Sequence, residues 1–216
     1  MAHHHPQPEL LVEYSAGALA IGQAACVSAH LSYCAECRKT TEQLQTVGSS
    51  LMERLQPEPV AEAVLESVLA RLDDPAPLSY QSPAASDQLP GLLERIINGD
   101  FSELVWRRVT SALSISYLAT GDREHEFALY RIAAGGSIPH HRHGGSEMTL
   151  VLEGGFSDSS GVYHPGDFVY REGSDSHAPT AIDDGECIVL AVLDAPLKFT
   201  QWRYRWMNPF LQLRAG

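Results

Sequence analysis

The chain has 216 residues, of which 44% are hydrophobic, so it is long enough for two small domains that each bury a core. It contains no run of eighteen apolar residues and no basic segment followed by an apolar one, so we expect neither a membrane span nor a secretory signal. The formal net charge of −12 argues against direct binding to nucleic acid, which needs a basic surface, and suits a basic protein partner better. These features predict a globular cytoplasmic protein that binds neither nucleic acid nor a membrane.

Apolar residues recur at helical spacing through the first seventy residues. The pattern comprises Leu10, Leu11, Tyr14 and Leu19, then Leu44, Val47, Leu51 and Leu55, then Val60, Val64, Leu65, Val68, Leu69 and Leu72. It predicts four helices, with a break at Pro57 and Pro59 before the last one. The fourth helix, from about Val60 to Leu72, has more aliphatic positions than one buried stripe needs. It is therefore either a core helix of a four-helix bundle or a helix that leaves its bundle to pack against a partner.

The cysteines indicate a metal site within this helical part. Two of the four, Cys34 and Cys37, form a His-x3-Cys-x2-Cys cluster with His30, whereas Cys26 and Cys187 have the character of buried apolar residues. On a helix the three cluster positions fall at i, i+4 and i+7, so their side chains can converge on one zinc ion. This cysteine usage favours a reducing compartment without disulfides. A redox dithiol is the alternative, but such a pair normally lies between a strand and a helix, and both flanks here are helical.

Three ligands leave one position of a tetrahedral zinc site to be filled. The run of three histidines at residues 3–5 precedes an apolar segment that can fold back against the helix carrying His30. Spacing alone does not decide whether His3, His4 or His5 completes the site.

A stretch rich in proline, serine and alanine between Asp73 and Pro90 predicts a linker. After a short lead-in at 91–98, the chain changes to short runs of β-branched and aromatic residues separated by glycine turns. The clearest such runs are Phe127 to Ile132, Met148 to Leu152, Asp167 to Tyr170 and Cys187 to Leu193. We therefore predict a multidomain chain: a zinc-binding four-helix domain (1–75), a linker and lead-in (76–98) and an all-β sandwich or barrel (99–216).

The predicted β domain carries a second set of metal-ligating residues: His141, His143, Glu147 and His177. In a strand, His141 and His143 point to the same face because side chains alternate with a period of two. Glu147 would follow on the next strand or after a short turn. His177 would complete the site from a more distant strand. His125, His140 and His164 lie outside this pattern and are expected at the surface or in turns.

The spacing from Gly135 to Gly154, Gly-x5-His-x-His-x3-Glu-x6-Gly, resembles the first cupin motif. The turn Pro165-Gly166-Asp167 followed by His177 resembles a variant of the second motif, with a longer gap before the histidine and no asparagine at the usual distance after it. The resemblance implies a cupin-like fold with zinc or another divalent transition metal at this site.

The order of the zinc-like helical part, the linker and the cupin-like part resembles the ChrR-type anti-sigma factors across nearly the whole chain. This resemblance implies a zinc-binding anti-sigma domain that clamps an extracytoplasmic-function (ECF) sigma factor, in a one-to-one complex, and a cupin-like domain needed for the response to singlet oxygen or related oxidants. It implies that His5 completes the N-terminal zinc site with His30, Cys34 and Cys37. It also implies that His141, His143, Glu147 and His177 hold the cupin metal.

The expected mechanism is inhibition by occlusion, in which the zinc-stabilised bundle inserts an apolar helix between sigma-factor domains. No catalytic residue is expected, because the sequence shows no second acid or base beside the cupin ligands. An enzyme remains the alternative, since cupins with this ligand set also perform dioxygenase or isomerase chemistry. A third alternative is a zinc-stabilised adaptor for a protein other than a sigma factor.

Overall fold

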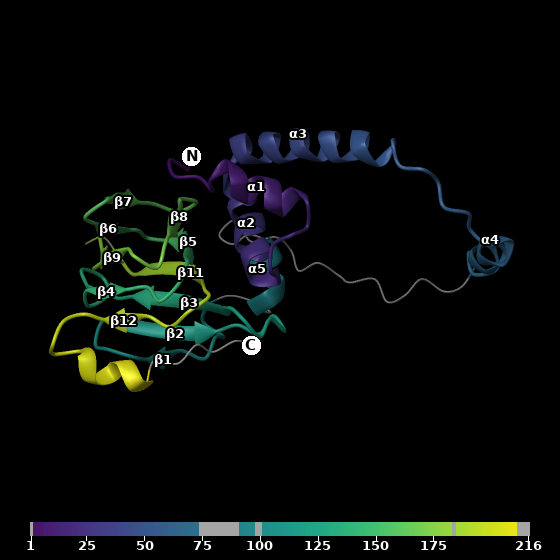
Figure 1. The fold of residues 1–216 in the computed structure, drawn as a ribbon. Coiled ribbons are helices and arrows are strands. Elements are labelled where there is room, and N and C mark those ends of the chain that lie inside the picture. The colour runs from purple at the N-terminus through teal and green to yellow at the C-terminus, as the bar shows by residue number, and fades with distance from the viewer. Residues whose placement is uncertain (1, 74–90, 98–100, 183–184, 211–216) are drawn as a thin grey trace.

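The computed structural model describes residues 2–73, 91–97, 101–182 and 185–210 of the chain. Helices come first along the sequence and strands follow, as Figure 1 shows. The α-helices are α1 (Pro8–Ser15), α2 (Ile21–Tyr33), α3 (Ala35–Met52), α4 (Glu62–Leu69) and α5 (Gly91–Ile97). The helical first part and the fourth helix were predicted, and the short lead-in of the sequence is helical over the range of α5. Most of the predicted linker lies outside the described residues.

Every strand pair among the described residues of the β part is antiparallel. A six-stranded sheet has the order β1 (Arg107–Arg108), β2 (Leu113–Tyr117), β3 (Glu126–Ile132), β11 (Cys187–Leu193), β5 (Glu147–Glu153) and β8 (Phe168–Arg171). Two three-stranded sheets have the orders β10 (Thr180–Ala181), β6 (Phe156–Asp158), β7 (Gly161–Tyr163) and β12 (Lys198–Phe199), β4 (His141–Arg142), β9 (Ser176–His177). A short 3-10 helix, η1 (Arg205–Phe210), follows β12. This is the predicted cupin-like sandwich.

The central strands of the six-stranded sheet are buried on both faces. Along β11 every residue from Cys187 to Leu193 is buried, which explains why the strand is apolar without alternation. Side chains on one face, such as Val189, pack toward the small sheets, and those on the other, such as Leu190, pack against the helices. The sequence predicted helical and β domains with separate cores, and this was wrong: α1, α2 and α5 share one hydrophobic cluster with the outer face of the sheet.

Helix α2 makes the closest approach to the sheet. A Cβ atom at Gly22 would lie 3.3 Å from Cδ2 of Phe127 and 3.5 Å from Cγ1 of Val192, so a glycine lets the helix backbone come near the strands. Further along, Cys26, Val27 and Ala29 are fully buried. Because small residues line this face, the end of α2 that carries His30 is held firmly against the β part.

Helices α2 and α3 are separate elements, and the break falls at the metal-like motif. Cys34 is extended, with φ −116° and ψ 105°, and its Sγ accepts a hydrogen bond from the amide of Cys37 at the start of α3. The expectation that His30, Cys34 and Cys37 lie along one continuous helix was therefore wrong. Cys34 acts as the N-cap of α3. Its side chain accepts a hydrogen bond from the amide of Cys37, which has no partner within the helix, and this bond stabilises the turn between the two helices.

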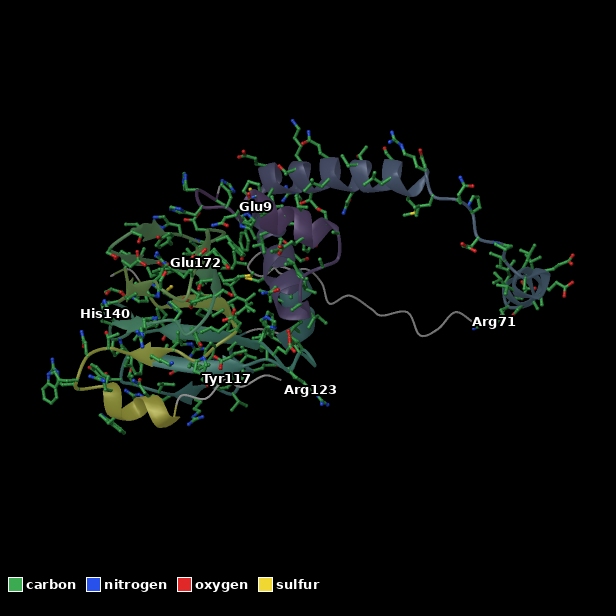
Figure 2. All side chains as sticks on the ribbon, viewed as in Figure 1. Glu9, Arg71, Tyr117, Arg123, His140 and Glu172 are labelled. Atoms are coloured by element: carbon green, nitrogen blue, oxygen red, sulfur yellow. The ribbon has the colours of Figure 1, made fainter. Side chains whose placement is uncertain are left out.

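Helix α4 stands apart from the rest of the described chain (Figure 1). None of its residues is buried against the described residues, so the alternative of a core helix in a four-helix bundle was wrong. Figure 2 shows that the side chains of α4, with Arg71 labelled nearby, lie well away from the sandwich. No helix within the described ranges is long and apolar enough to cross a membrane.

Gly154, the last glycine of the cupin-like motif, supports the turn from β5 to β6. Its φ is +66°, and a Cβ atom would overlap the carbonyl oxygen of Glu186. We expect Gly154→Ala to lower the free energy of unfolding by about 3 kcal/mol, because backbone strain and overlap add. The matched control is Gly121→Ala, where φ is +76° and the space is open, with an expected loss of about 1 kcal/mol. Urea unfolding measures both, and equal losses would contradict the role of the overlap.

Candidate metal centres

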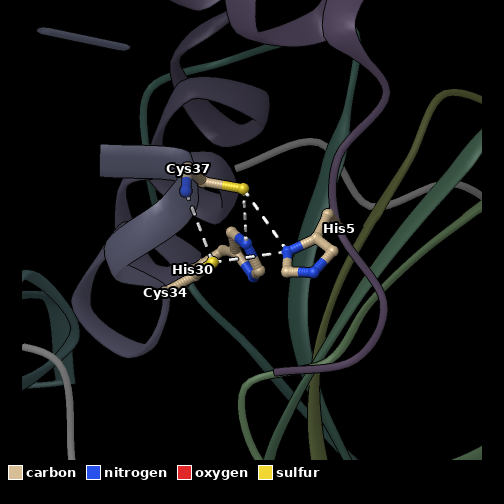
Figure 3. Close-up of side chains that lie close together, drawn as sticks. All are labelled: His5, His30, Cys34 and Cys37. Atoms are coloured by element: carbon tan, nitrogen blue, oxygen red, sulfur yellow. Dashed lines mark hydrogen bonds between the residues drawn. The ribbon is translucent and has the colours of Figure 1, made fainter. Parts of the chain in front are cut away.

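Four side chains converge where the N-terminal segment meets the α2–α3 junction. His5, His30, Cys34 and Cys37 each place a ligand atom within 4.8 Å of all the others, as Figure 3 shows. Nδ1 of His5 lies 3.3 Å from Sγ of Cys34 and 3.5 Å from Sγ of Cys37, and Nε2 of His30 lies 3.4 Å from Sγ of Cys37. The N-cap turn at Cys34 brings both sulfurs to the end of α2, so that they face the histidines.

These distances fit a tetrahedral zinc site. With typical Zn–S and Zn–N bonds of about 2.3 and 2.1 Å, a sulfur and a nitrogen on one zinc ion lie about 3.6 Å apart. The observed separations of 3.3 to 3.5 Å are close to that value. Two thiols and two imidazoles are also the donor set of a closed structural zinc site.

The surroundings prepare His30 and Cys37 for a metal ion. Nδ1 of His30 donates to the carbonyl of Gly166 at 2.8 Å, which leaves Nε2 without a proton and aimed at the sulfurs. Burial lowers the pKa of His30, so the ring is neutral at pH 7. Burial, and then the neighbouring Cys34, raise the pKa of the Cys37 thiol to about 12. A bound cation would reverse this effect, and metal binding would release a proton.

The structure separates the three N-terminal histidines that spacing left equivalent. His5 joins the candidate zinc cluster and is its exposed member. The ring of His4 packs on Tyr163, with ring centroids 4.7 Å apart. His3 is exposed.

The second cluster lies inside the β part. His141 and His177 face each other across the β4–β9 pair, and both group with His143 within 4.8 Å. Nε2 of His143 is 3.1 Å from Nε2 of His177 and 3.1 Å from Oε2 of Glu147, which is itself 3.8 Å from Nε2 of His177. The predicted second set of ligands is therefore brought together, with the carboxylate touching two of the three histidines.

The electrostatics of this cluster also fit a cation. Burial lowers the pKa values of His143 and His177 to about 4 and raises the pKa of Glu147. At pH 7 the two rings are neutral, and because Nδ1 of His177 donates to Asp158, its Nε2 carries a lone pair that faces the cluster. Oε2 of Glu147 is buried without a hydrogen-bond partner among the described residues. A divalent ion bound by these atoms would accept the lone pair of His177 and give the unpaired oxygen of Glu147 a partner.

Two groups outside the cluster, which the sequence did not predict, orient the rings of His141 and His177 through hydrogen bonds. Nδ1 of His141 donates to the carbonyl of Pro139 at 2.9 Å, and Nδ1 of His177 donates to Oδ2 of Asp158 at 2.9 Å. Arg171 forms an ion pair with the same carboxylate oxygen. These bonds direct Nε2 of each ring to the cluster. Asp158 lies 19 residues before His177, and no motif linked the two in sequence.

A small cavity adjoins this cluster. It has a volume of about 20 Å³ and is lined by His141, Glu147 and His177 together with apolar residues such as Ile138 and Phe156. That volume holds about one water molecule, whereas pockets for organic ligands usually measure about 300 Å³ or more.

Three comparisons with known proteins agree with this architecture. The ChrR Cupin-like domain family matches residues 95–195. The chain is 35% identical to the anti-sigma-E factor ChrR of Cereibacter sphaeroides over 214 residues, which cover 97% of this chain and 98% of that protein. The crystal structure of Rhodobacter sphaeroides SigE in complex with the anti-sigma ChrR matches with a TM-score of 0.81 and 34% identity, covering 90% of this chain and 100% of that one.

Helices with a cluster suited to zinc, followed by a cupin-like sandwich, define the class of anti-sigma factors that carry a cupin-like domain. This chain belongs to the ChrR family of anti-sigma factors.

Proposed function

We propose that this chain binds an ECF sigma factor in a one-to-one complex and inhibits it by occlusion. The relative of known structure was solved in complex with SigE, and its whole length aligns with this chain. A partner bound along the projecting helices would be kept from core RNA polymerase and promoter DNA. Inhibition would then follow from covered surface, with no chemical step required.

The observation that carries this proposal is the exposed apolar surface of α3 and α4. On α4, the side chains of Val64, Leu65, Val68 and Leu69 are 50 to 59% exposed and follow helical spacing along one face. A second row runs along the end of α3 and beyond it, through Val47, Leu51, Met52 and Leu55, all at least 58% exposed. Contiguous apolar surface of this kind marks a protein interaction site, and an amphipathic helix suits a groove on its partner.

Within this proposal, zinc at His5, His30, Cys34 and Cys37 has a structural role. A closed site of two histidines and two cysteines contributes folding energy and leaves no open position for chemistry. It would fix the α2–α3 junction and therefore the direction in which α3 projects. The cupin-like site at His141, His143, Glu147 and His177 would hold zinc or another divalent transition metal.

We also propose that oxidative stress of the singlet-oxygen or peroxide type releases the sigma factor. Support comes from family membership and from the placement of the second metal cluster in the cupin-like part, behind the sheet on which α2 packs. A change at that cluster could therefore reach the helices through packed side chains.

Catalysis at the cupin-like site, of the dioxygenase or isomerase type, is the second candidate. The convergence of His141, His143, His177 and Glu147 favours it, because such sites also bind catalytic metals. The small volume of the adjoining cavity favours the regulatory role instead, since an organic substrate would need the cavity to enlarge greatly.

Co-expression with ECF sigma factors from the same genome, followed by size-exclusion chromatography and metal analysis, tests the proposed function. We expect one sigma factor to co-elute as a heterodimer that contains zinc. A chain that elutes alone in the presence of every such sigma factor would contradict the proposal and favour the enzymatic alternative.

A further inference from the structure

A turn of the β part reaches directly into the surroundings of the N-terminal cluster. Gly166, between β7 and β8, accepts the Nδ1 hydrogen bond of His30 at 2.8 Å. Its φ is +92°, and a Cβ atom there would lie 2.8 Å from Cβ of Tyr33, so only glycine lets the turn approach α2 this closely. The ring of Phe168, two residues on, packs edge-on against the ring of His30, with centroids 5.8 Å apart.

The same turn holds the segment that carries His5. Oδ1 of Asp167 accepts the backbone amides of His3 and His4, while Oδ2 accepts the amide of His164 at 2.8 Å and so holds the turn itself. The amide of Phe168 donates to the carbonyl of His4 at 3.0 Å. His5 is an exposed ligand, and the backbone directly before it is tied to the β part rather than to the helices.

We infer that residues 164–168 of the cupin-like part position two of the four N-terminal zinc ligands, His30 through Gly166 and His5 through Asp167. Zinc binding and the docking of the N-terminal segment on the β part are then one linked equilibrium, in which each strengthens the other. The inference rests on the proposed zinc centre and deepens the proposed regulation. It supplies a route by which movement in the cupin-like part loosens the zinc and the helices that it organises.

The first test is the rate at which the full-length protein loses zinc to a chromogenic chelator. We expect Asp167→Ala to release the N-terminal zinc at least about tenfold faster than the unmodified chain, as is usual when an outer-shell partner is lost. Asp167→Asn should be intermediate, because one amide oxygen cannot replace both carboxylate oxygens. Asp122→Ala is the matched control: Asp122 also accepts two backbone amides in a turn, those of Glu124 and His125, and its variant should release zinc at the unmodified rate.

The second test removes zinc ligands and measures how firmly the N-terminal segment is docked on the β part. It leaves the sequence of the turn at 164–168 unaltered. In the variant Cys34→Ala with Cys37→Ala, hydrogen exchange at the amides of His4 and Phe168 should become faster, while exchange along β11 stays slow. If Asp167→Ala fails to fold, this hydrogen-exchange measurement still tests the inference. Unchanged release from Asp167→Ala, or unchanged exchange at these amides, would overturn the inference alone. If the zinc content were unchanged by the two cysteine substitutions, the proposed zinc centre would instead be overturned.

Discussion

Replacing Cys34 and Cys37 together with alanine should remove one zinc equivalent per chain and abolish sigma-factor binding. Structural zinc sites supply on the order of 10 kcal/mol of folding free energy in small domains. Without the two sulfurs, the cluster retains only His5, which is exposed, and His30. The turn between α2 and α3 would also lose the Cys34 N-cap. Helix α3 would then no longer be held in the direction that presents its exposed apolar row.

Cys26 and Cys187 provide the matched control, because replacing them with alanine removes the same number of thiols. Both side chains are fully buried in the hydrophobic cores, and neither belongs to either candidate metal cluster. We expect this control to be less stable, as core truncations are, but to keep its full metal content and to bind the sigma factor. Metal analysis and co-elution measure both properties. If the control and the Cys34–Cys37 variant lost the same amount of zinc, the N-terminal assignment would be wrong.

Part of each cluster could be predicted because some of its ligands follow short local patterns. A His-x-His pair in a strand points both rings to one side, and Cys-x2-Cys brings two sulfurs together wherever a helix begins at the first cysteine. The long strands were equally accessible, because β11 is apolar over its whole length and the middle of β3 and of β5 is rich in aromatic, aliphatic and β-branched residues. In these segments, local preference and tertiary packing favour the same structure.

What the sequence did not reveal depends on contacts between distant segments. Asp167 lies more than 160 positions from the amides of His3 and His4, and no periodicity links them. The choice of His5 over its neighbours follows from that contact, so spacing alone left it open. The shared core of α2 and the sheet was missed for a similar reason: an apolar helix face does not specify which apolar surface will cover it.

The exposed face of α4 leads to the second large prediction: the double variant Leu65→Asp with Leu69→Asp should bind the sigma factor at least about 100-fold more weakly. Burying a leucine side chain contributes about 1.5 to 3 kcal/mol, and every 1.4 kcal/mol is a tenfold change in affinity. Two carboxylates placed in an apolar groove would add a desolvation cost. Titration calorimetry of the purified components measures the change.

Two controls separate this effect from general damage to the surface. Glu66→Ala alters the same helix on the side away from its apolar row, and Val162→Asp introduces a carboxylate at a valine of β7 that is as exposed as Val64, at 50% each. Both should bind within about threefold of the unmodified chain. The double variant should also unfold at the same urea concentration as the unmodified chain, because Leu65 and Leu69 are exposed and α4 buries no residue against the described chain.

This combination of results would identify α4 as a binding element rather than a folding element. A helix of eight residues is too short to be stable alone in water, so its apolar row must be covered for the helix to persist. Full affinity in the double variant would show that the partner covers α3 alone. Occlusion would then depend on the row from Val47 to Leu55, and the cysteine variant would still lose binding, because the proposed zinc site would direct that helix.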